Sequence, residues 1–126
     1  MILGKVINGF EAVVKLTVEG RDRSSVEISA IVDTGFTGEL TLAPAQIAML
    51  RLAPCGGCKA MLADGRTVES NVYRATVVWD GAVRRIRVVE TANDALVGMR
   101  LLRGCRLQMD VIANGEIAIS ALTRRD

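Results

Sequence analysis

The sequence has no histidine, only three cysteines and 3% aromatic residues among its 126 residues, and each shortage excludes something. Three thiols without histidine are too few for a structural zinc site, which usually needs four ligands. An odd number of cysteines does not fit the disulfide framework of a small secreted domain. The near absence of aromatic residues means that the core must be aliphatic, built from Val, Ile, Leu, Ala and Met. We therefore expect no metal and no cofactor.

Long apolar runs are also missing, and so is a strong charge of one sign. No segment approaches the roughly 20 apolar residues of a membrane helix. The first residues lack the charged start and apolar centre of a signal peptide, so we expect a cytoplasmic protein without a membrane partner. The net charge is +2, and the basic residues are scattered, whereas nucleic-acid binding needs a basic stripe. We expect no nucleic-acid partner, and we interpret the alternating Arg85 and Arg87 as a solvated strand face.

Abundant β-branched residues and 12 glycines are typical of strands joined by tight turns. The length fits one domain, residues 1–126, with one core. The turn dipeptides Asp64-Gly65, Asp80-Gly81 and Asn114-Gly115 predict hairpins. The expected strands cover residues 5–18 (with a break at 8–9), 26–32, 39–43, 59–79 (as one hairpin), 83–90, 96–98, 105–112 and 116–122. Short helices are expected at 44–50, where Pro44 takes the first helical position, and at 99–103. The predicted fold class is all-β.

We interpret two cysteines and four methionines as structural residues. Cys55-Gly56-Gly57-Cys58 is expected to be an ordinary loop with Pro54. Half a zinc site or a redox pair are the functional alternatives, but no βαβ unit of the thioredoxin kind accompanies the motif. Four methionines are predicted to fill the core, with a substrate pocket as the alternative for the second of them: Met49, Met61, Met99 and Met109.

The most informative segment is Asp33-Thr34-Gly35. An apolar, β-branched strand leads into one carboxylate, a hydroxyl residue and a glycine follow, and a second apolar strand begins at Leu40. One alternative is a strand-end turn in which the aspartate caps backbone N–H groups. Another is the phosphate loop of actin-like ATPases, which shares Asp33-x-Gly35-x-Thr37 but needs a chain several times longer. A phosphotransferase aspartate would need a second aspartate that is missing here.

A carboxylate in such a turn suits metal-free peptide hydrolysis when it is paired with a second one. Two carboxyls a few ångströms apart share one proton, because they cannot easily both ionise. The ionised member takes a proton from water, and the protonated member supports the developing oxyanion. This chain holds one such turn. The second carboxylate would therefore come from an identical chain, with Asp33 facing its own copy across a two-fold axis.

The sequence around this turn resembles the retropepsin-like aspartic proteases. It resembles most closely the small prokaryotic clan AA group whose turn reads Asp-Thr-Gly-Phe. Three features match in order over roughly residues 10–122. They are Val32-Asp33-Thr34-Gly35-Phe36, a hairpin at Lys59–Ser70 in the place of the flap, and Ala95–Leu102, which is similar to the family's hydrophobic-hydrophobic-glycine strand and helix. The resemblance implies an acid-protease barrel with one or two short helices.

The resemblance also implies roles for individual residues. Asp33 would be the catalytic carboxylate and Thr34 would hydrogen-bond across the dimer axis. Gly35, within the catalytic turn, and Thr37 would offer backbone groups to an extended substrate. The substrate-binding residues would be Phe36, Thr37, Met61, Ala63, Asp64, Gly65 and Arg66, of which the last four belong to the flap tip. Retroviral enzymes usually carry a small residue in place of Phe36 and an acidic one in place of Thr37. The chain also has no obvious long terminal strands for a retroviral-type dimer sheet.

The expected function is that of an aspartic endopeptidase, active as a homodimer on an extended peptide or protein substrate. The alternative is a non-catalytic retropepsin-like module that serves dimerisation or peptide binding. Both functions use the same fold.

Overall fold

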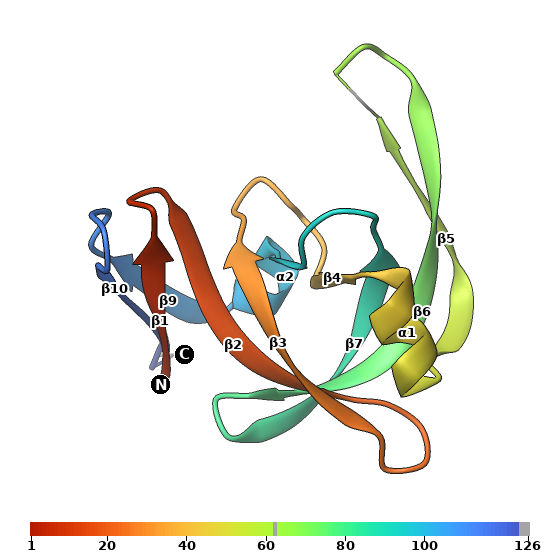
Figure 1. Ribbon diagram of the computed structural model, residues 1–126, viewed down its shortest axis with the longest axis horizontal. Coiled ribbons are helices and arrows are strands. Elements are labelled where there is room, and N and C mark those ends of the chain that lie inside the picture. The colour runs from red at the N-terminus through yellow and green to blue at the C-terminus, as the bar shows by residue number, and fades with distance from the viewer. Residues whose placement is uncertain (62, 124–126) are drawn as a thin grey trace.

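The computed structural model describes residues 1–61 and 63–123, and these form ten strands and two short helices (Figure 1). The first half contains β1 (Ile2–Ile7), β2 (Glu11–Glu19), β3 (Ser25–Val32), β4 (Leu40–Leu42), α1 (Pro44–Leu50) and β5 (Ala53–Met61). The second half contains β6 (Thr67–Trp79), β7 (Ala82–Glu90), β8 (Leu96–Val97), α2 (Met99–Leu102), β9 (Cys105–Met109) and β10 (Glu116–Ala121).

All ten strands belong to one sheet, in the order β5-β6-β7-β4-β8-β3-β2-β1-β10-β9. An additional antiparallel pairing joins β6 to β2, with Val77 opposite Val18. This pairing folds the sheet back on itself, so that the chain forms a partly closed all-β barrel. The predicted fold class is confirmed.

The predicted hairpins are present because their turns contain residues that tolerate positive φ. Asp80 and Gly81 have φ of 52° and 81° between β6 and β7, and Asn114 has φ of 62° between β9 and β10. Gly65, with φ of 87°, turns the chain between β5 and β6. Short polar side chains and glycine accept this left-handed conformation at low cost.

The core is aliphatic, as the composition predicts, because the inward positions of the strands carry branched side chains. The largest fully buried side chains are Val6, Val14, Val18, Leu40, Leu42, Leu50, Val77, Val88, Val97, Leu101, Ile117 and Ile119. The prediction that methionine fills this core is wrong for three of the four residues. Met49, Met61 and Met99 are 56%, 76% and 47% exposed, whereas Met109 packs against the core.

The predicted loop at residues 54–58 is also wrong, because β5 runs through it. Pro54 pairs with Tyr73 and Gly57 pairs with Asn71, so β5 has one more residue than β6 over this interval. That extra residue is a β-bulge, and Gly56 has φ of 115° there. Cys55 and Cys58 are half-buried free thiols on this strand.

Candidate active site

Asp33 lies directly after β3, at the centre of the sheet. β3 pairs in parallel with β8, with Ile31 opposite Leu96. The backbone N–H of Asp33 donates to the carbonyl of Val97 at 2.9 Å, which extends this pairing by one residue. The aspartate is therefore held at the end of a central strand instead of on a mobile loop.

The turn itself orients the carboxylate. Gly35 N–H donates to Oδ1 of Asp33 at 2.8 Å, and Phe36 N–H donates to the Asp33 carbonyl at 3.1 Å. The Asp33 side chain is half-buried, while Thr34 and Gly35 are exposed. One face of the turn thus stays open on a single chain, as a site completed by a second molecule requires.

Three backbone hydrogen bonds fasten the loop of residues 33–39 to the segment after β8. Gly98 N–H donates to Glu39 at 2.9 Å, Met99 N–H to Phe36 at 2.8 Å, and Arg100 N–H to Gly38 at 3.1 Å. Because three consecutive N–H groups of residues 98–100 donate to carbonyls of this loop, the loop cannot move away without breaking several bonds together.

Gly98 permits this close approach. A Cβ added to Gly98 would lie 2.2 Å from the carbonyl oxygen of Gly38 and 2.6 Å from Cδ2 of Phe36. The Phe36 ring also covers Gly38, where an added Cβ would lie 2.5 Å from Cζ. Half-buried Phe36 thus packs against two glycines of its own chain, a packing role that sequence reasoning missed.

Thr41 fixes the other side of β8. Its side chain is almost fully buried, at 5% exposure. Oγ1 accepts a hydrogen bond from Leu96 N–H at 2.8 Å and donates one to the carbonyl of Asp94 at 3.4 Å. A hydroxyl is needed here because β4 ends its pairing with β8 after one residue, Leu40 opposite Val97. The sequence signal was a lone threonine between two leucines.

The predicted flap is a real hairpin, and its tip is ordered by its own side chains. Asp64 Oδ1 accepts from Arg66 N–H at 3.0 Å, and Asp64 Oδ2 accepts from Arg66 Nε at 2.6 Å. The hairpin of β5 and β6 rises away from the body and stands clear of the 33–39 loop (Figure 1). Within one chain the structure therefore does not bring Met61, Ala63 or Gly65 over Asp33, and all three are exposed. Thr37 is exposed on the loop itself.

The described residues contain no cluster of side chains that could bind a metal ion. In residues 1–61 and 63–123, no group of three or more Cys, Asp or Glu side chains could hold an ion. The helices of this part of the chain, seven and four residues long, are too short to cross a membrane.

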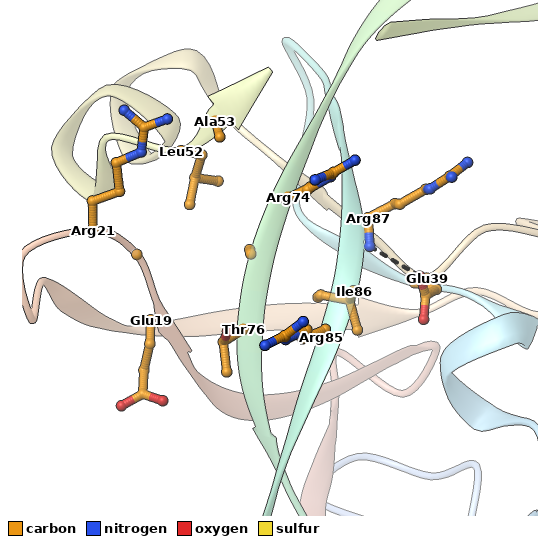
Figure 2. Close-up of a pocket in the computed structure, with 12 residues that line it drawn as sticks. Glu19, Arg21, Glu39, Leu52, Ala53, Arg74, Thr76, Arg85, Ile86 and Arg87 are labelled. Atoms are coloured by element: carbon orange, nitrogen blue, oxygen red, sulfur yellow. Dashed lines mark hydrogen bonds between the residues drawn. The ribbon is translucent and has the colours of Figure 1, made fainter. Parts of the chain in front are cut away.

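Two cavities lie next to this loop. One, of about 560 Å³, is bordered by β6, β7 and the start of β5, and the other, of about 690 Å³, lies beside α2. Glu39 lines both, and its Oε1 accepts a hydrogen bond from the backbone N–H of Arg87 at 2.9 Å (Figure 2). Sequence reasoning missed both cavities, because they depend on strand pairing across distant segments.

Comparison with known proteins finds structural neighbours. No protein-family model and no curated protein matches the sequence. The structure is similar to that of EIAV protease complexed with the inhibitor HBY-793, with a TM-score of 0.55 and 18% identity over 71% of this chain and 84% of that chain. It is also similar to a retropepsin-like aspartic protease from Rickettsia conorii, with a TM-score of 0.56 and 16% identity over 94% of this chain and 90% of that one. The chain has the retropepsin-like fold.

Proposed function

We propose that the protein is an aspartic endopeptidase, active as a homodimer in which each chain contributes Asp33. The observation that carries the proposal is the position of Asp33 in a retropepsin-like fold. Its carboxylate is oriented by Gly35 N–H at the end of a central strand, beside the exposed Thr34. The two structural neighbours are both named as proteases, which supports the same reaction class.

The mechanism follows from two Asp33 carboxyls sharing one proton. The ionised carboxylate removes a proton from a water molecule as that water attacks the peptide carbonyl carbon. The protonated carboxyl donates its hydrogen bond to the carbonyl oxygen, where negative charge develops. The proton then passes to the leaving amine as the C–N bond breaks. Gly35, with no side chain, lets an extended substrate approach the backbone closely.

The remaining predicted site residues take supporting roles in this proposal. Thr34 would hydrogen-bond across the two-fold axis, and Phe36 and Thr37 would border the bound peptide. The flap residues Met61, Ala63, Asp64, Gly65 and Arg66 would close over the substrate and exclude water. Closure has to come with dimer formation or substrate binding, since the hairpin stands clear of Asp33 in a single chain.

Asp33→Asn tests the catalytic assignment directly. We expect this variant to fold and dimerise normally but to lose cleavage of a denatured protein or peptide library. Asp22→Asn is a matched control, because Asp22 is exposed and pairs only with exposed Arg51, so its activity should be unchanged. Retained cleavage by Asp33→Asn would refute the assignment. Activity should also be highest at acidic to mildly acidic pH, and a flat profile into alkaline pH would contradict a shared proton.

A mixing experiment tests the shared site. If chains exchange freely, adding an equal amount of Asp33→Asn chain places half of the wild-type chains in mixed dimers. Cleavage should then fall to about half of its original rate. Undiminished cleavage, with exchange verified by differently labelled chains, would mean that each chain works alone. A protein that dimerises but never cleaves would instead favour the non-catalytic binding module.

A further inference from the structure

Arginine side chains are concentrated in the linings of the two cavities that Glu39 borders, and four of them come from β6 and β7. Arg21, Arg74, Arg85 and Arg87 line the first cavity, and Arg84, Arg100 and Arg103 line the second. We call these seven residues the arginine surface. Glu19 and Glu39 are the carboxylates in the two linings. The sequence interpretation of Arg85 and Arg87 as a solvated face is correct as to exposure, but it does not explain this clustering.

The clustering makes the charge distribution uneven. The chain has 16 basic and 14 acidic residues, and seven of the basic ones but only two of the acidic ones lie in these two linings. This small part of the surface thus carries an excess of five positive charges, whereas the rest of the chain has three more negative than positive charges. A local field of this kind attracts an anionic partner even when net charge is near zero.

The register of β6 and β7 places two of these arginines next to each other. Arg74 lies directly opposite Arg87 across β6 and β7, and Arg85 lies opposite Thr76. Figure 2 shows the Arg74 and Arg87 side chains on neighbouring strands, directed to the same side. Like charges in directly opposite positions destabilise a sheet. Within residues 1–61 and 63–123, the ion pairs formed involve neither arginine, so no carboxylate of the described chain offsets this repulsion.

Within the described residues Glu39 forms an ion pair with neither guanidinium, and its Oε1 accepts the backbone N–H of Arg87. The unpaired guanidinium groups can therefore bind the anionic groups of another molecule. Planar guanidinium forks bind carboxylates through two parallel hydrogen bonds, which a lysine cannot do. All seven basic residues in the two linings are arginine.

We propose that the arginine surface docks an acidic peptide segment of another protein, outside the catalytic turn. Leu52 and Ala53 in the first lining offer apolar contact to the side chains of such a segment. A nucleic acid fits less well, because the linings of the two cavities contain no aromatic residue on which bases could stack. The proposal goes beyond the proposed function and is independent of it.

Fluorescence anisotropy with Asp33→Asn protein tests the proposal without interference from cleavage. The probe is a labelled twelve-residue peptide in which glutamate alternates with alanine, and the control probe has glutamine in place of glutamate. We expect Arg74→Gln with Arg87→Gln to weaken binding of the acidic probe about tenfold or more at moderate salt. Lys5→Gln with Arg106→Gln removes the same charge from exposed positions on β1 and β9, and should weaken binding less than about threefold.

Lysine variants and competing ligands test whether the guanidinium groups and an acidic peptide are specifically required. Arg74→Lys with Arg87→Lys keeps the charge but removes the guanidinium fork, so an intermediate loss is expected. Circular dichroism and thermal unfolding verify that every variant is folded. Equal binding of the glutamine probe, or equal losses in the two glutamine double variants, would overturn the proposal. It would also be overturned by tighter, Arg74-dependent and Arg87-dependent binding of a twelve-nucleotide thymidine strand, or by complete displacement with millimolar inorganic phosphate.

Discussion

Replacing Gly98 with alanine tests whether close packing next to β8 holds the Asp33-Thr34-Gly35 turn in place. Gly98 has φ of −104° and ψ of 178°, a conformation that alanine adopts without strain. The backbone geometry therefore does not require glycine, and only the lack of space does. The added Cβ would lie 2.2 Å from the Gly38 oxygen, far inside the ordinary contact distance of 3.4–4 Å.

The magnitude follows from what must move. Overpacking of this kind costs about 1–3 kcal/mol. Separating the two segments also weakens the bonds from Gly98, Met99 and Arg100, and each net hydrogen bond contributes about 0.5–1.5 kcal/mol. We expect Gly98→Ala to lower the free energy of unfolding by about 2–5 kcal/mol in total. For a domain of this size the melting temperature would fall by roughly 10–20 °C.

The assay is thermal and urea unfolding, followed by cleavage activity at a temperature where the variant remains folded. Gly104→Ala is the matched control, because Gly104 has φ of 84° and nothing lies within 4 Å of its added Cβ. It should cost about 1 kcal/mol through backbone strain alone. The reasoning is refuted if Gly98→Ala is no more destabilising than Gly104→Ala. Phe36→Leu should not rescue Gly98→Ala, because the nearest atom is a backbone oxygen.

Three further predictions concern other parts of the chain. Thr41→Val should lower the free energy of unfolding by about 1–3 kcal/mol in urea titrations, because the part-buried Leu96 N–H loses its acceptor, whereas Thr41→Ser should retain most of the stability. A smaller loss for valine than for serine would contradict this. Arg74→Thr should raise the free energy of unfolding by up to about 1 kcal/mol by removing a like-charge cross-strand pair, and a fall would argue against repulsion. Specific activity should drop on dilution as dimers dissociate, in parallel with the mass measured by ultracentrifugation. Constant specific activity in a monomeric sample would exclude the shared site.

Much of the fold was predictable because its signals are local. Asp80-Gly81 alone forms the turn between Trp79 and Ala82, and alternating apolar residues mark the strands that it joins. Asn114-Gly115 belongs to a longer connection, because β9 ends at Met109, three residues earlier than predicted, and β10 begins at Glu116. The bulge in β5 was not predictable from the glycines alone. It depends on the pairing of Pro54 and Gly57 with a partner strand that follows more than ten residues later.

The candidate site likewise has one part that could be predicted from local sequence and another that could not. The turn at Asp33 could be recognised as a candidate from the sequence, since the proposed chemistry needs a carboxylate followed by small residues. The surroundings of that turn could not, because Gly98 and Thr41 act through contacts with segments some 55 to 60 residues away. The exposed methionines are a related case. Met49 and Met99 lie on the outer sides of very short helices, and the 3.6-residue period is hard to recognise over four to seven residues.

The pairing of β1 with β10 has a consequence for how the molecule is made. Ile2 lies opposite Ile119, so during synthesis β1 is made more than 100 residues before the strand that covers its free edge. Contacts this distant in the chain slow folding, because the long intervening segment must first be ordered. A nascent chain that stops before Glu116 exposes the hydrogen-bonding groups of β1, which makes it prone to aggregation and a natural client for chaperones.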